Sequence, residues 1–198
     1  MNRARQFTER EYQREIEPTF RKIFQCTASF GEMFTSNMVA RAILFPVFPQ
    51  LTLLEFQALS YAARAGGDPC AYLSLLDRID DMNYVQHWQV SLESGEEYSN
   101  LKTANSVLEN ALYSPDGKWG IRLTLQRFAV VGGSLAFIET LFNQLSSSVE
   151  MHTLSFLAAY KVDPNYFGGD IGWLDGFLSE LYGHEKSQAL LSVAGLLS

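Results

Sequence analysis

Cysteine and histidine are scarce in this chain of 198 residues. The two cysteines, Cys26 and Cys70, have neither the spacing of a zinc site nor that of a Cys-x-x-Cys redox pair. The three histidines, His87, His152 and His184, are dispersed and bring no two ligands onto one helical face. We therefore expect two free thiols in a reducing compartment, and we predict no cofactor and no metal centre built from cysteine or histidine.

Long apolar runs are also missing. The longest candidate, around residues 40–47, is stopped by Pro46 and falls well below the roughly 18 residues that a membrane span needs. At the N-terminus, Arg3 and Arg5 precede a charged helical pattern rather than the apolar core of a signal peptide. These absences favour a cytoplasmic protein that has no membrane partner.

Positive charge is limited, because 15 Lys and Arg face 22 Asp and Glu, for a formal net charge of −7. This balance argues against a nucleic-acid partner. Most of the excess lies in residues 68–116, where nine acidic residues face only Arg78 and Lys102. If this region has a binding role, it favours a basic protein partner. The acidic partner surface that we predict consists of Asp77, Asp80, Asp81, Glu93, Glu96 and Glu97.

Recognised catalytic and phosphate-binding motifs are absent from the sequence. Residues 130–134, Val-Val-Gly-Gly-Ser, lack the Gly-x-Gly-x-x-Gly and Walker spacings, and the chain contains no Gly-x-Ser-x-Gly elbow. The loop over residues 163–170 has Asp and Asn without EF-hand spacing. Asp77, Asp80 and Asp81 can converge on one helical face and hold a divalent cation, although a solvated acidic face has the same pattern. The sequence thus favours a binding protein over an enzyme.

Core material, in contrast, is abundant, with 47% hydrophobic and 13% aromatic residues. The stretch of residues 118–145 is the one around which we expect the chain to be organised. Its apolar residues alternate up to Leu125 and then change parity at Phe128, which predicts a strand over residues 118–131 with a bulge near Gln126 or burial on both faces. Gly132 and Gly133 end this strand, and Ser134 is placed to cap a helix.

The N-terminal part has helical signals. Thr8 with Glu11, and Thr52 with Glu55, have the spacing of capping boxes, which predicts a helix after each threonine. The Asp68-Pro69 pair predicts a further helix, running to about residue 81. Nothing before residue 82 requires a sheet. We therefore predict an N-terminal helical subdomain over residues 1–82.

Strand signals begin after this boundary. Residues 84–93 alternate between apolar and polar, which predicts a strand with one solvated face, and residues 101–112 fit a helix. Several helices follow residue 134. The predicted fold is α+β and helix-dominated, with the helical subdomain, a small and mostly antiparallel sheet, and flanking C-terminal helices over residues 83–198.

The polar faces of the two strands supply the predicted binding site. Lys118, Arg122 and Thr124 alternate with apolar residues, and Arg127 follows them. An exposed edge of a small sheet can pair with an extended peptide while neighbouring charges select it. A plain solvated sheet surface has the same pattern. The residues assigned to peptide or partner binding are Lys118, Arg122, Thr124, Arg127, His87 and Gln89.

Three functions are compatible with these patterns. The first is a non-catalytic subunit or adaptor that recruits a peptide or protein, in a hetero-complex rather than an obligate homo-oligomer. The second is an acidic inhibitor or immunity-type protein that covers a basic toxin or nuclease. The third is a metal-dependent enzyme that uses dispersed residues, for which Asp77, Asp81 and His87 are the best set.

Overall fold

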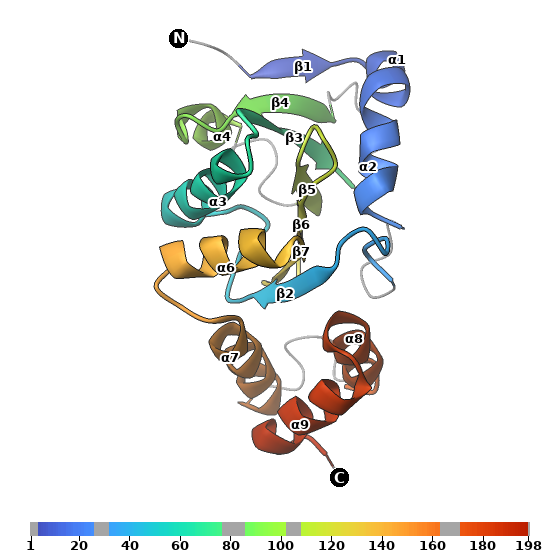
Figure 1. Cartoon of the computed structure of the whole chain (residues 1–198), viewed down its shortest axis with the longest axis vertical. Helices are drawn as coiled ribbons and strands as arrows, with labels where there is room; N and C mark the ends of the chain where they lie inside the picture. Colours follow the sequence, from blue (N-terminus) through green and yellow to red (C-terminus); the bar gives the residue numbers. More distant parts are fainter. Residues whose placement is uncertain (1–3, 26–31, 77–85, 102–107, 163–170, 198) are drawn as a thin grey trace.

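A seven-stranded antiparallel sheet forms the centre of the molecule (Figure 1). The computed structural model describes residues 4–25, 32–76, 86–101, 108–162 and 171–197. The strands are β1 (Arg5–Phe7), β2 (Ala40–Leu44), β3 (Cys70–Leu75), β4 (His87–Ser91), β5 (Asn110–Tyr113), β6 (Gly120–Leu123) and β7 (Ala129–Gly133). Their order in the sheet is β1-β4-β3-β5-β6-β7-β2. The α+β class predicted from the sequence is confirmed.

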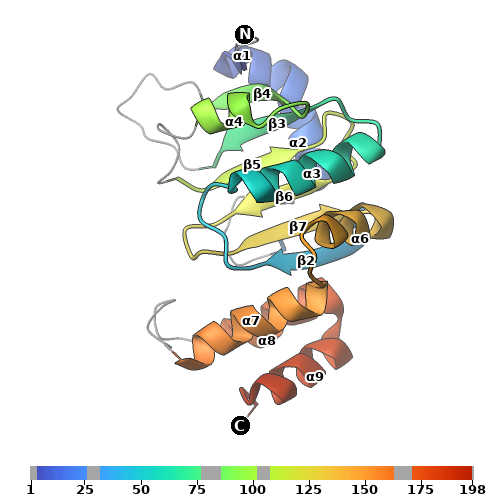
Figure 2. The ribbon, with the colours of Figure 1, turned by 90° about the vertical axis from the view of Figure 1, so that its left-hand side faces the viewer.

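Helices cover both faces of this sheet. The helical segments are α1 (Glu9–Glu11), the π-helical turn η1 (Tyr12–Ile16), α2 (Glu17–Ile23), α3 (Leu53–Ala65), α4 (Glu96–Asn100), α6 (Leu135–Gln144), α7 (Val149–Val162), α8 (Trp173–Tyr182) and α9 (His184–Ala194). One core lies between the sheet and α3, α4 and α6; the second lies under η1 and α2 and extends to α7, α8 and α9. Figure 2 shows α3 and α6 across one face and the last three helices beyond β2.

The two predicted capping boxes are confirmed. Thr8 and Thr52 each accept a hydrogen bond from the backbone N–H three residues on, and the Glu11 and Glu55 carboxylates each return to the backbone N–H of the capping threonine. Ser134 likewise caps α6. These contacts span only three residues, so the local sequence specifies them.

The prediction of helices alone before residue 82 is wrong, because β1, β2 and β3 all lie there. The predicted helix after Asp68-Pro69 is strand β3, which pairs with β4 and β5. Asp68 does not cap a helix; its carboxylate accepts a hydrogen bond from Trp119 Nε1 at 2.7 Å. The boundary at residue 82 lies outside the described residues, and strands from both sides of it share one sheet.

Two further predictions fail because of strand pairing. The end of the helix expected over residues 101–112 is strand β5, which lies between β3 and β6. The single strand expected over residues 118–131 is the hairpin of β6 and β7. Its turn is closed by a bond from Thr124 N–H to the Phe128 carbonyl oxygen, and Arg127 has a φ of 61°. The parity change in the sequence therefore marks a turn. The strand predicted around residues 84–93 is confirmed as β4.

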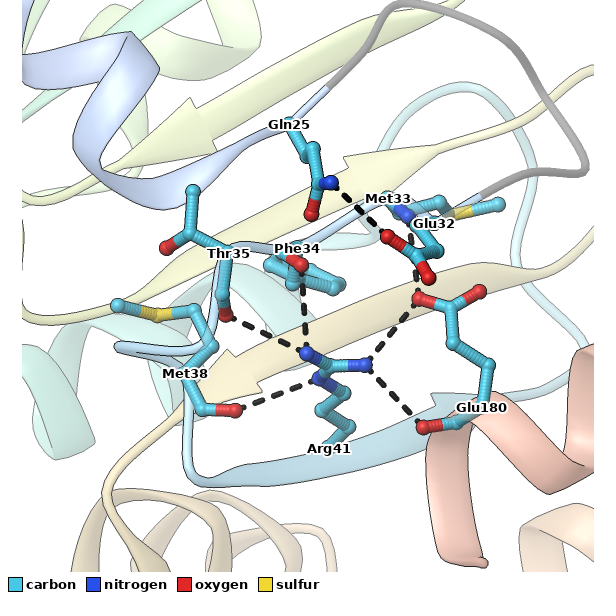
Figure 3. A network of polar contacts seen from close by, with 8 residues as sticks. All are labelled: Gln25, Glu32, Met33, Phe34, Thr35, Met38, Arg41 and Glu180. Atoms are coloured by element: carbon cyan, nitrogen blue, oxygen red, sulfur yellow. Dashed lines mark hydrogen bonds and ion pairs between the residues drawn. The ribbon is translucent and has the colours of Figure 1, made fainter.

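The two outer strands of the sheet differ in their surroundings. The β2 edge meets the C-terminal helices, since the Ile43 N–H donates to Tyr182 Oη at 3.1 Å. Arg41, on the same strand, joins the segment before β2 to Glu180 on α8 (Figure 3). Strand β1, at the opposite edge, is short, and Arg5 and Gln6 are exposed. Polar side chains thus cover this outer strand, which has β4 as its one neighbour among the described strands of the sheet.

Candidate functional site

A pocket of about 390 Å³ lies where the N-terminal helices cross the ends of β3 and β4. This volume is in the lower part of the range of about 300–1,000 Å³ found for ligand sites. The lining residues are Glu9, Tyr12, Glu17, Phe20, Arg21, Phe24, Gln25, Ser74, Leu75, Leu76, Gln86 and His87. The pocket thus joins an N-terminal segment to strands that lie more than forty positions later in the chain.

The N-terminal helical segment forms one wall of the pocket. It starts after the Thr8 cap and continues through η1 into α2. Pro18 has no N–H to donate to the carbonyl of Arg14, so a regular α-helical ladder cannot pass through it. The π-helical turn just before this proline lets the helix continue into α2.

The floor of the pocket is a chain of buried hydrogen bonds. Ser74 Oγ lies 2.9 Å from His87 Nδ1 and 2.8 Å from Tyr113 Oη. The Tyr12 ring stacks on the His87 ring, with 3.4 Å between centroids and 5° between planes. Burial raises the pKa of Tyr113 well above its usual range and that of Tyr12 to about 12. Ser74 on Nδ1 and the stacked Tyr12 ring hold the imidazole in one orientation, and Tyr113 contacts the Ser74 hydroxyl.

Ser74, His87 and Glu9 form a serine–histidine–carboxylate chain, but its geometry differs from that of a serine hydrolase. Glu9 Oε2 lies 3.7 Å from His87 Nε2, while the serine is on Nδ1, the reverse of the usual order. Ser74 is only 1% exposed, and its hydroxyl is shared with Tyr113. The contacts favour a rigid floor for binding over a nucleophile.

The walls and rim combine aromatic rings with charged groups. Phe20 and Phe24 contact one another, with 4.7 Å between centroids, and both pack edge-on against Tyr113. At the rim, Arg21 Nε donates to Glu17 Oε1 at 2.9 Å. The pocket thus combines aromatic rings with a larger share of polar surface around them.

The positive strip predicted at Lys118, Arg122, Thr124 and Arg127 is not continuous on the surface, and that prediction is wrong: Lys118 and Arg127 are exposed, but Arg122 and Thr124 between them are buried. Strand β6 lies inside the sheet, and its register places Arg122 on the same covered face as Ser74 and His87. Arg122 is 1% exposed and bonds to Glu109 Oε2 at 2.9 Å. Thr124 is buried and donates to the Phe128 carbonyl oxygen.

Lys118 precedes β6 and Arg127 follows it, and each has its own local partner. The Lys118 ammonium pairs with Asp116 and Asp68, and the Arg127 guanidinium covers the Phe48 ring. The strip was predicted from alternation alone, which shows that these residues share a face but cannot show that helices bury that face.

His87 and Gln89 share a strand face, as predicted, but this face is not a solvated one. His87 is 6% exposed under Tyr12, and Gln89 is half-buried and donates to Cys70 Sγ. His87 is the member of the predicted set that lines the pocket. The sequence interpretation missed Tyr12, Phe20 and Phe24, whose helical spacing indicated a buried stripe without showing which strands it would cover.

Three of the six residues of the predicted acidic surface, Glu93, Glu96 and Glu97, lie within the described ranges. Glu93 and Glu96 are exposed around the start of α4, while Glu97 is half-buried and accepts from the Ser91 N–H. Asp77, Asp80 and Asp81 lie outside the described residues, as does the loop over residues 163–170. Within the described ranges, no three His, Cys, Asp or Glu side chains gather to hold a metal ion. The metal-enzyme hypothesis therefore stays a prediction.

Comparison with known proteins assigns no function to this pocket. In the part of the chain that the structure describes, no helix has both the length and the apolar composition to cross a membrane. Comparisons of the chain with protein-family models, with curated proteins and with solved structures find no match.

Proposed function

We propose that this protein is a non-catalytic binding protein that recognises a segment of another protein in the pocket between the N-terminal helices and β3–β4. The observation that carries the proposal is the pocket itself, in which aromatic walls stand over a floor held by the Ser74, His87 and Tyr113 hydrogen bonds. A preorganised pocket of this kind reduces the ordering cost of binding.

The position of the pocket supports a polypeptide ligand. His87 on its floor pairs directly with Phe7 of β1, the outer strand whose Arg5 and Gln6 are exposed. An exposed outer strand can add a partner strand by main-chain hydrogen bonds, while a neighbouring pocket receives a side chain. The combination of strand edge and pocket supports a protein or peptide partner, and recruitment within a hetero-complex.

An acidic inhibitor of a basic toxin or nuclease is the second candidate. It is supported by the exposed carboxylates of Glu93 and Glu96 and by the net charge of −7. The double substitution Glu93→Lys and Glu96→Lys should weaken partner binding strongly at low salt and weakly at high salt. Glu150→Lys, at an exposed position of α7, is the matched control. If Glu150→Lys weakened binding as much as the double substitution, the result would count against this candidate.

Filling the pocket tests the main proposal. Gln25 and Gln86 line it, and neither is buried, so Gln25→Trp and Gln86→Trp add bulk there without disturbing the core. Gln57→Trp, at an exposed position of α3 on the opposite face of the sheet, is the matched control. The tagged proteins are used for affinity purification from the native host, and urea unfolding checks that each variant is folded.

The partner recovered with the wild type and with Gln57→Trp should be lost from both pocket variants. Equal recovery from all four proteins would show that the pocket is not the binding site. A loss from Gln57→Trp alone would place the contact on the opposite face of the sheet.

A further inference from the structure

The charges around the pocket are unequal in number and in availability. Two carboxylates, Glu9 and Glu17, and one guanidinium, Arg21, line it. Arg21 is bound by Glu17 through both Nε and Nη2, so this cation is already neutralised. The Glu9 carboxylate is 52% exposed and lies beside the rim. The balance of charge at the rim is therefore negative, as it is for the whole chain.

The aromatic lining suits a cation as well. Tyr12, Phe20 and Phe24 all contribute to the pocket. The negative face of an aromatic ring attracts ammonium and guanidinium groups, and the effect is larger for partly desolvated cations. The long apolar stem of lysine or arginine can contact phenylalanine rings while its charged end reaches a carboxylate.

The ionisation of Tyr12 agrees with this charge distribution. Burial is the main cause of its raised pKa, and the next two causes are the Glu17 and Glu9 carboxylates, which disfavour a phenolate. The same negative potential favours a cation at the pocket.

We propose that the pocket receives a lysine or arginine side chain of the partner protein, held between the aromatic walls and the Glu9 carboxylate. This inference rests on the proposed binding function and specifies the chemistry of the partner. It also connects the pocket to the overall acidity of the chain, since a negatively charged protein attracts a basic partner over longer distances.

A short peptide series tests the proposal. The probes are acetyl-Gly-Ser-Arg-Ser-Gly-amide, the same peptide with citrulline in place of arginine, and the same peptide with glutamate. Citrulline keeps the shape of arginine and removes its charge. Binding is followed by NMR chemical shifts of the full-length protein, with the side-chain amides of Gln25 and Gln86 as reporters within the pocket.

The arginine peptide should shift the pocket resonances. The citrulline and glutamate peptides should bind more weakly, by up to about fivefold, which is the upper range for one partly exposed ion pair. Glu9→Gln, which keeps the size of the side chain, should weaken arginine binding by about fivefold, and Glu150→Gln should leave it unchanged. No pocket shifts with arginine, equal binding of citrulline, or an unaltered Glu9→Gln variant would overturn the inference.

The two proposals can fail separately. Loss of the cellular partner from Gln25→Trp, together with equal binding of the arginine and citrulline peptides, would retain the binding pocket and reject a cationic ligand. Unchanged partner recovery from Gln25→Trp would reject the pocket as the partner site, and with it the basic side chain of that partner.

Discussion

Arg41→Ala should be among the most damaging single substitutions outside the two cores. The Arg41 guanidinium lies 3.1 Å from both the carboxylate and the backbone carbonyl oxygen of Glu180 (Figure 3). It also donates to the carbonyl oxygens of Phe34, Thr35 and Met38 at 3.2–3.3 Å. One side chain thus joins the segment before β2, strand β2 and helix α8.

The expected loss in the free energy of unfolding depends on how buried the pair is and on which groups each substitution leaves without a partner. The Arg41 and Glu180 side chains are 16% and 15% exposed, so alanine leaves an acidic group in a mostly buried place without its cation. We expect Arg41→Ala to lower the free energy of unfolding by about 3 kcal/mol, at the lower end of the cost of breaking a buried pair. Glu180→Gln should cost about 1 kcal/mol, because an amide oxygen can still accept from the Met33 N–H.

The pair also predicts a pH dependence. Burial raises the pKa of Glu180, and the Arg41 charge and the Met33 hydrogen bond oppose the shift. The folded protein therefore binds more protons than the unfolded chain in the range just above pH 4.5, so this group makes stability fall as pH rises through that range. Glu180→Gln should remove this contribution, and Arg41→Ala should enlarge it.

Urea unfolding, followed by tryptophan fluorescence and circular dichroism at several pH values, measures both effects. Glu150→Gln on the exposed face of α7 is the control for a change of one charge. A cost below about 1 kcal/mol for Arg41→Ala, far beneath the range for a broken buried pair, would refute the structural role of the network. Equal pH slopes for wild type and Glu180→Gln would refute the assignment of the raised pKa.

Three further predictions concern single positions. Arg122→Met should lower stability by about 3–5 kcal/mol in urea unfolding, because it removes the buried cation beside Glu109, and Glu109→Leu in addition should recover most of the loss. Ser146→Gly should raise the free energy of unfolding by up to about 1 kcal/mol, because Ser146 follows α6 with a φ of 52° and glycine adopts this conformation freely. Ser146→Ala is the control, and it should give no gain in stability. In a spectrophotometric titration, the difference between wild type and Tyr12→Phe should show a tyrosine that ionises near pH 12. The variant should also lose less stability than wild type between pH 10 and 12, because the raised pKa makes the folded wild type bind one more proton than its unfolded chain in that range. A difference curve centred near pH 10 would contradict the burial of this ring.

How much of the candidate site could be predicted depends on how far apart its residues lie in the chain. The alternating pattern of residues 84–93 identified His87 as a strand residue that shares a face with Gln89, and the structure agrees. The pattern could not show that Tyr12 stacks on His87, because 75 positions separate the two rings in the sequence. The pocket exists only after the N-terminal helices dock on β3 and β4.

The buried polar residues show the same limit. The period of two in residues 118–125 suggested that the strand face of Arg122 meets solvent, but β6 lies inside the sheet and Arg122 is buried. A polar residue on the outer face of a strand is usually exposed to solvent. Arg122 is an exception because Glu109, just before the neighbouring strand β5, supplies the compensating charge within the core.

By itself, the sequence determined what can be inferred from patterns over a few neighbouring positions: the two capping boxes, the Ser134 cap, the alternation that predicted strand β4, and the α+β class. Only the tertiary structure decided that residues 70–75 form a strand, that residues 118–131 form a hairpin and that β6 lies inside the sheet. The physical reason is that a helix cap satisfies its own backbone groups, whereas a strand takes its hydrogen bonds from segments that are distant in the chain. The helices that cover the sheet also bury Arg122, which the sequence alone assigned to the surface.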